Sequence, residues 1–218
     1  TIDHQRRLAE PIQRAKKLLN DGRIGEIERL EWSEVNLFDA GSHLFDLCDY
    51  LVGGERAEWM LAGIDCAHEN RWFGALNERR AIARWQYADG TVGFASTAED
   101  GETVVDAYIR IVGEDGVIEI QPKDGPAMRI RTDGGWEEIS TDENIYGPTP
   151  SLVHTALTKV TAPLPIITGP KQPPNHYQQA IEHVVSSLSR GSEPIFSGRR
   201  VLRGTELIFA SWESSRRR

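Results

Sequence analysis

Apolar residues recur at helical spacing in the first part of the chain, with lysine and arginine residues on the opposite side. The apolar positions are Ile12, Ala15, Leu18 and Leu19. Pro11 suits a first helical turn, because the N–H that proline lacks has no helical partner there. Gly22 is a typical stop signal. We therefore predict a linking helix within residues 1–24.

Three further segments have helical patterns. Residues 39–52 place apolar side chains on one face, and Gly53-Gly54 follows as a stop signal. Those side chains are Leu44, Leu47, Cys48 and Leu51. Residues 175–190 form a second candidate, and a third begins after Ser197, a residue type that commonly caps a helix.

Between these helices the pattern changes to strands. The candidate strands are 27–35, 58–66, 80–88, 91–98, 103–113, 116–121, 127–131 and 135–140. Five Asp-Gly steps in residues 89–134 indicate tight turns between antiparallel neighbours. Residues 141–174, rich in Pro, Thr and Gly, predict a long loop. Residues 1–218 are thus expected to form a single α+β domain. Its core is a large, mostly antiparallel open sheet with helices packed on one face.

Composition narrows the classes of partner. The 218 residues carry a net charge of −8, which disfavours binding to nucleic acid or to an anionic membrane. No apolar run approaches the ~18 residues of a membrane span, and the first residues lack a hydrophobic signal segment. Cys48 and Cys66 match no zinc or redox motif, and Cys48 is expected to pack in the core. We expect a cytoplasmic protein.

Several common motifs are absent from the sequence. It contains no G-x-G-x-x-G and no G-x-x-x-x-G-K-[ST], so no phosphate-binding loop is found. It also contains no H-E-x-x-H, no G-x-S-x-G and no pair of C-x-x-C motifs. The chain is therefore not expected to contain a Rossmann domain.

The segment DAGSHLFD, residues 39–46, carries the most suggestive chemistry. Asp39 and His43 are four residues apart, so a helix places them on one face within contact distance. A carboxylate beside an imidazole orients the ring and raises its pKa. His43 is then suited to exchange a proton with a substrate hydroxyl. Asp46 lies about one turn further along.

Other interpretations of this segment remain open. Asp39 alone is a good helix cap, and a histidine at the position of His43 is common on helices without any chemical role. A metal site formed by Asp39, His43 and Asp46 is disfavoured, because the sequence offers no second cluster of ligands.

The order of several short motifs adds context. They are HQRR at residues 4–7, AKKLLNDGRIGEI at 15–27, DAGSHLFDL at 39–47, RIVGEDGVIEI at 110–120 and GSEPIFSGRRVLRGTELIFASWES at 191–214. In this order they resemble the C-terminal domain of the Gfo/Idh/MocA oxidoreductases, the family of glucose-fructose oxidoreductase and inositol dehydrogenase. The resemblance extends over nearly the whole chain.

The resemblance implies roles for individual residues. His43 would be the acid/base histidine that deprotonates a substrate hydroxyl, and Asp39 would orient it and bind a hydroxyl. Asp46 would support this pair from behind or be structural. Arg7 would line the substrate cleft, and Arg6 would lie near the nicotinamide.

The resemblance also implies roles for Asn36 and for residues 70–78. Asn36, just before the motif, is expected to face substrate. Residues 70–78, including Trp72, would form a loop over the pocket or an exposed turn.

The same resemblance implies partners. The substrate would be a sugar, a polyol or a related hydroxyl compound. NAD or NADP would be bound by a nucleotide-binding domain that this chain lacks, as it lacks the family's Glu-Lys-Pro lysine motif. We therefore expect a fragment, an isolated domain or one product of a split gene. The open face of the sheet is expected to make homo-oligomer contacts.

Two alternatives to a catalytic half remain. One is a non-catalytic binding or dimerisation module of the same fold. The other is an unrelated domain that binds a small molecule.

Overall fold

The structure of the chain is a computed structural model that describes residues 1–54, 56–66, 70–72, 74–148 and 176–217. The predicted loop at 141–174 lies mostly outside these residues. Its first part contains a two-stranded pair, β11 (Glu143–Asn144) with β12 (Gly147–Pro148).

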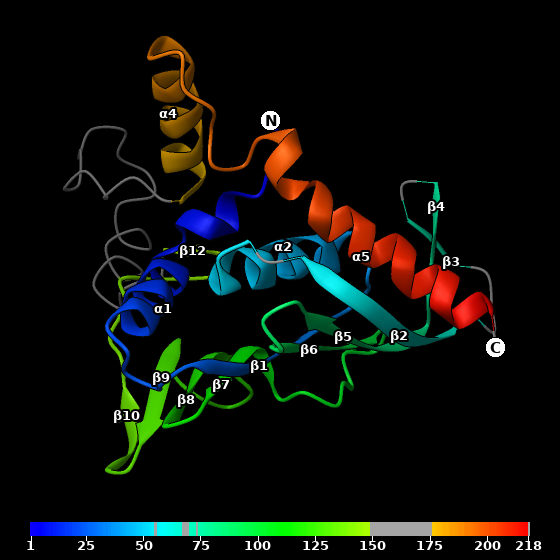
Figure 1. Cartoon of the computed structure of the whole chain (residues 1–218), viewed down its shortest axis with the longest axis horizontal. Coiled ribbons are helices and arrows are strands. Elements are labelled where there is room, and N and C mark those ends of the chain that lie inside the picture. Colours follow the sequence, from blue (N-terminus) through cyan, green and yellow to red (C-terminus); the bar gives the residue numbers. More distant parts are fainter. Residues whose placement is uncertain (55, 67–69, 73, 149–175, 218) are drawn as a thin grey trace, which may run out of the picture.

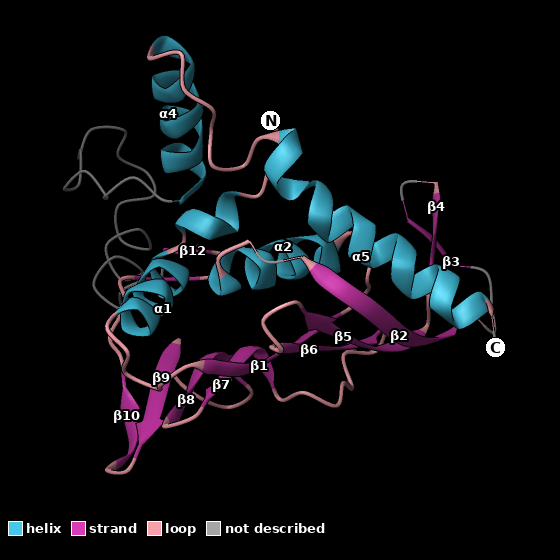
Figure 2. Cartoon of the chain, viewed as in Figure 1, coloured by secondary structure: helices cyan, strands magenta, loops and turns pink. Residues whose placement is uncertain are grey.

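An eight-stranded sheet organises the chain, with strand order β10-β9-β8-β7-β1-β6-β5-β2 (Figure 2). Its strands are β1 (Ile27–Glu34), β2 (Ala57–Asp65), β5 (Arg80–Tyr87), β6 (Val92–Ala98), β7 (Ala107–Gly113), β8 (Gly116–Pro122), β9 (Met128–Thr132) and β10 (Gly135–Glu138). Each corresponds to a predicted segment, although β7 begins four residues later than expected. The prediction of a large, mostly antiparallel open sheet is confirmed.

Strand β1 lies between β6 and β7, parallel to the first and antiparallel to the second. This insertion explains why the Asp-Gly steps differ in effect. Four of them join strands that pair as antiparallel neighbours, at residues 89–90, 115–116, 124–125 and 133–134. The step at 100–101 follows β6 and begins the connection to β7, which lies beyond β1.

Four α-helices and a short 3-10 helix occur in the described part of the chain. They are η1 (Gln5–Leu8), α1 (Glu10–Asn20), α2 (Ala40–Val52), α4 (His176–Ser189) and α5 (Gly198–Arg216). Helices α2 and α5 lie over one face of the sheet, whereas α4 projects away from it (Figure 1). As predicted, α2 buries Leu44, Leu47, Cys48 and Leu51, and Ser197 caps α5.

Strand β5 shows how the sheet separates core from surface. Its alternate residues Ala81, Ala83 and Trp85 are buried in the core, while Ile82 and Arg84 are exposed. At the sheet edge, α5 runs beside β2 and covers part of its free backbone. The N–H groups of Ala62 and Ile64 donate to the hydroxyls of Ser214 and Ser215, at 3.1 and 3.0 Å.

A small hairpin, β3 (Asn70–Trp72) with β4 (Ala75–Asn77), replaces the loop or turn that the sequence predicted at residues 70–78. The side chain of Trp72 lies outside the described part of the structure. None of the helices in the described residues combines the length and apolar character needed to cross a membrane.

Candidate active site

The motif at residues 39–46 begins where β1 turns into α2, and Asn36 shapes that turn. The Asn36 side-chain oxygen accepts hydrogen bonds from the backbone N–H groups of Asp39 and Ala40, both at 2.9 Å. These bonds satisfy donors at the start of the helix that have no helical partner. Asn36 is buried, and its side-chain oxygen caps the start of the helix.

Two further contacts fix the start of α2. A side chain at Gly41 would place its Cβ 2.7 Å from the Asn36 carbonyl oxygen, so only glycine allows this close approach. The buried carboxylate of Glu78 accepts the Leu37 N–H at 2.6 Å and the Thr97 hydroxyl at 2.7 Å. The turn is therefore attached both to its own helix and to the sheet.

The structure does not pair Asp39 with His43 as the spacing suggested. Asp39 is exposed, His43 is partly buried, and no hydrogen bond or ion pair joins them in the described structure. Burial lowers the pKa of His43 to about 3, with further lowering from the positive charge of Arg6 and from His4. The expectation of a raised pKa is thus wrong, because desolvation and the positive charge of Arg6 dominate and no carboxylate among the described residues counteracts them. His43 Nδ1 is buried without a hydrogen-bond partner.

Arg6 belongs to a cluster with two tyrosines and a carboxylate. It donates a 2.5 Å hydrogen bond to the Tyr108 hydroxyl and lies 3.8 Å from Glu34. Its guanidinium also faces the rings of Tyr108 and Tyr146, at 5.6 and 5.4 Å. Burial and the Glu34 charge raise the pKa of Tyr146 to about 12. Arg6 therefore keeps a fixed positive charge near His43.

Arg7 has a different environment from its neighbour. Its Nε and one terminal nitrogen donate to the two carboxylate oxygens of Asp46, both at 2.7 Å, and the other terminal nitrogen donates to the Ile195 carbonyl. Arg7 and Asp46 are only 4% and 1% exposed. The guanidinium is thus engaged inside the protein, and this geometry does not place it along an open cleft. Asp46 in turn lies 3.5 Å from His4 Nδ1.

The arrangement can handle a proton at one imidazole. A histidine that stays neutral at physiological pH has a nitrogen lone pair available to accept one. Within the described residues, no group of three or more His, Cys, Asp or Glu side chains is arranged to hold a metal ion.

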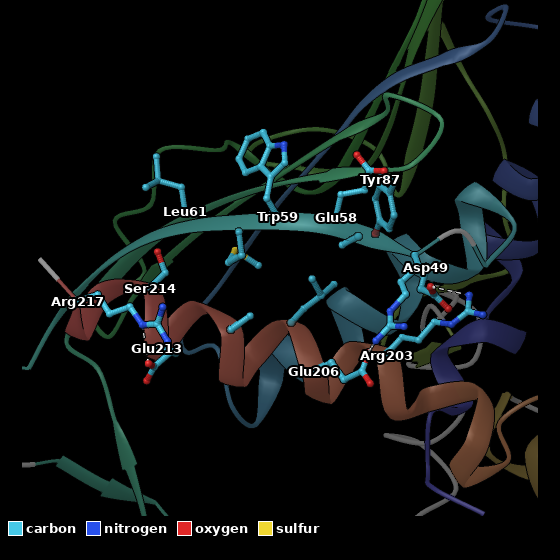
Figure 3. Close-up of a pocket in the computed structure, with 15 residues that line it drawn as sticks. Asp49, Glu58, Trp59, Leu61, Tyr87, Arg203, Glu206, Glu213, Ser214 and Arg217 are labelled. Atoms are coloured by element: carbon cyan, nitrogen blue, oxygen red, sulfur yellow. Dashed lines mark hydrogen bonds and ion pairs between the residues drawn. The ribbon is translucent and has the colours of Figure 1, made fainter.

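Two cavities in the described part of the chain are not lined by Asp39 or His43 of the predicted motif. A cavity of about 330 Å³ lies beside the Arg6 cluster and is lined by Glu34, Tyr108, Tyr146 and others, but not by His43 or Asp39. A larger groove of about 710 Å³ runs between β2 and α5. Figure 3 shows Asp49 and Arg203 at one end of this groove and Glu213 and Arg217 at the other.

Sequence reasoning missed several residues that contact Arg6, the turn before α2 or His43. Tyr108 and Tyr146 are more than 100 residues from Arg6 in the chain, so no local pattern connects them. Glu34 and Glu78 were overlooked because an isolated glutamate in or near a strand has no distinguishing spacing. His4 was part of a quoted motif but received no role.

Comparisons with solved structures support the fold. An oxidoreductase from Agrobacterium radiobacter, in complex with NAD+, L-tartaric acid and magnesium, is 18% identical over 98% of this chain and 62% of its own, with a TM-score of 0.66. The aldose-aldose oxidoreductase from Caulobacter crescentus, complexed with glycerol, is 19% identical over 99% of this chain and 61% of its own, with a TM-score of 0.69. The WlbA dehydrogenase from Bordetella pertussis, in complex with NADH and UDP-GlcNAcA, is 20% identical over 98% of this chain and 60% of its own, with a TM-score of 0.62.

This chain therefore spans less than two thirds of each of these proteins. No curated protein sequence matches the chain significantly. The family model described as "Oxidoreductase family, C-terminal alpha/beta domain" matches residues 28–218. On this evidence the chain belongs to the Gfo/Idh/MocA oxidoreductase family, whose C-terminal alpha/beta domain it contains.

Proposed function

We propose that this chain is the substrate-binding and catalytic half of a nicotinamide-dependent oxidoreductase that acts on a sugar, a polyol or a related hydroxyl compound. The observation that carries the proposal is the partly exposed His43 imidazole. It has no hydrogen-bond partner on its buried Nδ1, and its lowered pKa keeps it neutral. A neutral imidazole has a lone pair that can accept the hydroxyl proton when an alcohol is oxidised, and binding of the substrate and the nucleotide-binding domain would have to raise its pKa toward the working pH for this step.

The comparisons support a nicotinamide cofactor and hydroxylated substrates. Two of the similar structures contain NAD+ or NADH, and L-tartaric acid, glycerol and UDP-GlcNAcA are bound in the three. Each of these compounds carries hydroxyl groups. Whether the cofactor is NAD or NADP depends on residues that contact the ribose, which we assign to another domain.

This chain would supply only part of the cofactor and substrate site. The sequence has no Gly-rich phosphate loop, so the nucleotide would be held by a separate nucleotide-binding domain. Nicotinamide bound there would supply the hydride acceptor. This chain would supply the proton acceptor, His43, and the residues that orient the substrate hydroxyl.

The other residues support this step in different ways. Asp39 is exposed beside the helix start and is proposed to bind a substrate hydroxyl. Arg6 is proposed to face the nicotinamide side of the cleft, since its charge already acts on His43. Arg7 and Asp46 are assigned to holding the helix and η1 together.

Isothermal calorimetry with NAD+ tests the division of labour. The isolated chain is expected to bind NAD+ weakly or not at all, because it lacks the phosphate loop. Oxidation of a polyol is expected only when a cognate nucleotide-binding domain is present. Tight NAD+ binding by the chain alone would contradict the proposal.

A second candidate function, a dimerisation module, is favoured by the open face of the sheet. Leu61 and Ile82 are about half exposed there, and together with the exposed Val104 they line a shallow cavity on this face. In Figure 3, Trp59 and Leu61 point from β2 away from α5, toward this uncovered face. An apolar face of this kind is suited to contact with a second copy of the chain. Self-association is compatible with catalysis, so we propose it alongside the oxidoreductase role.

A further inference from the structure

His4 is a buried titratable residue to which the proposed reaction gives no role. It is 7% exposed and precedes the short helix η1. Its ring lies against the His43 ring in an edge-to-face arrangement, with centroids 5.0 Å apart and an angle of 64° between the planes. It therefore contacts the imidazole to which we assign proton transfer.

Asp46 connects His4 to a charge that is fixed in place. The Asp46 Oδ2 atom lies 3.5 Å from His4 Nδ1, and the same carboxylate is held by Arg7 through two 2.7 Å hydrogen bonds. His4 thus has a nearby carboxylate inside the protein. His43 has no ion-pair partner among the described residues, and the Nδ1 atoms of both rings are buried without a hydrogen bond.

The two rings cannot easily be charged together. Unit charges about 5 Å apart repel by several kcal/mol at the effective dielectric constant of ~20 typical of proteins, so a first proton on the pair opposes a second. Burial is the largest effect on His4 and lowers its pKa overall, while the negative charge of Asp46 favours its protonated form. A proton on the pair is therefore more stable on His4.

The remaining charges around the two rings agree with this preference. On His4, Asp3 acts in the same direction as Asp46, while Arg6 and Arg7 oppose protonation. On His43, both Arg6 and His4 oppose it, and no carboxylate favours it. Tyr108, from β7, hydrogen-bonds Arg6 and adds no competing negative charge while its hydroxyl is neutral.

We propose that His4 is a positioning residue of the site: as the pH falls, it takes up the first proton that the pair binds and so opposes protonation of His43. This inference rests on the proposed role of His43. Its test, however, needs neither substrate nor cofactor. A failure here is therefore separate from a failure of the oxidoreductase assignment, which calorimetry and turnover would reveal.

The test is an NMR titration of the histidine rings in the full 218-residue chain, with His4 and His43 assigned by substitution. On lowering the pH from 8 to the acid limit of the folded state, His4 is expected to take up its proton before His43. This order is measured in the wild-type chain. Protonation of His43 first, or of both rings together as independent sites, would overturn the proposal.

Two variants separate charge from packing. His4→Asn keeps a polar side chain near Asp46, and His4→Phe keeps a ring against His43, but neither can carry the proton. Both are expected to move the protonation of His43 upward by about one pH unit. Lys17→Gln, which removes an exposed charge on α1, is the matched control and should leave the pH at which His43 is protonated unchanged. The proposal would be overturned if the pH at which His43 is protonated stayed the same in both His4 variants, or shifted in only one of them. If neither variant folds, the wild-type order of protonation decides.

Discussion

Both carboxylate oxygens of Asp46 accept hydrogen bonds from the Arg7 guanidinium, where the two side chains are almost completely shielded from water. The pair joins α2 to the segment that precedes α1. Asp46 lies 3.5 Å from His4 Nδ1 and about one helical turn from His43. The chemistry proposed for His43 therefore depends on a buried ion pair.

Breaking this pair from one side should be costly. Asp46→Asn leaves the buried Arg7 charge without its counter-charge, and we expect a loss of about 3–5 kcal/mol in the free energy of unfolding. Urea unfolding followed by circular dichroism measures this loss. Arg14→Ala, which removes an exposed pair with Glu10, is the control and should cost about 1 kcal/mol or less. Equal effects of the two substitutions would show that the Arg7–Asp46 pair does not anchor the helix.

Gly41→Ala should disturb the start of α2. The added Cβ would lie 2.7 Å from the Asn36 carbonyl oxygen and 3.0 Å from the Trp32 ring. Neither neighbour can move freely, so we expect a loss of about 1–3 kcal/mol in thermal or urea unfolding. Gly134→Ala meets nothing within 4 Å and serves as the control. A neutral Gly41→Ala variant would mean that the turn before His43 is looser than described.

Acid should destabilise the folded chain partly through His43. The pKa of His43 is lowered to about 3, from an ordinary value of 6.5. Between these values the unfolded chain binds a proton that the folded chain excludes, so stability falls as pH falls below about 6.5. His43→Gln should reduce this slope by up to about 1.4 kcal/mol per pH unit.

Urea unfolding at pH 7, 6 and 5 measures the slope. Ser42→Ala, at the neighbouring helix position, changes no titratable group and should keep the wild-type slope. A His43→Gln variant with the wild-type slope would place His43 in contact with water, and its pKa near the ordinary value.

Self-association should depend on the open face of the sheet. Ile82→Glu places a charge among the exposed apolar side chains of that face, and we expect sedimentation velocity to show a shift from dimer to monomer. Phe209→Glu alters an exposed apolar residue of α5 and should leave the dimer intact. A wild-type chain that remains monomeric at high concentration would exclude this face as a dimer contact.

Much of the fold could be predicted from the sequence, because its signals are local. The apolar stripe from Leu44 to Leu51 specifies a helix and its buried face, and the Asp-Gly turns specify antiparallel neighbours. The insertion of β1 between β6 and β7 was not predicted, because pairing between distant strands leaves no mark in local spacing.

The candidate site could be predicted only in part, for a related reason. Spacing placed Asp39 and His43 on one helix, but it could not show that burial and Arg6 would dominate the pKa of His43. The family resemblance assigned Arg7 to a cleft, and the sequence could not show its ion pair with Asp46, which is 39 residues away in the chain. Charges fixed by tertiary contacts determine the chemistry here, and their partners can be identified only in three dimensions.

The central claim is that His43 accepts the substrate proton, and turnover measures it most directly. The enzyme formed by this chain with its nucleotide-binding domain would be assayed for polyol oxidation by NADH or NADPH formation. His43→Gln should lower kcat by about 10²–10⁴-fold while circular dichroism remains unchanged, and Ser42→Ala should retain activity. A folded His43→Gln enzyme with near wild-type kcat would contradict the account.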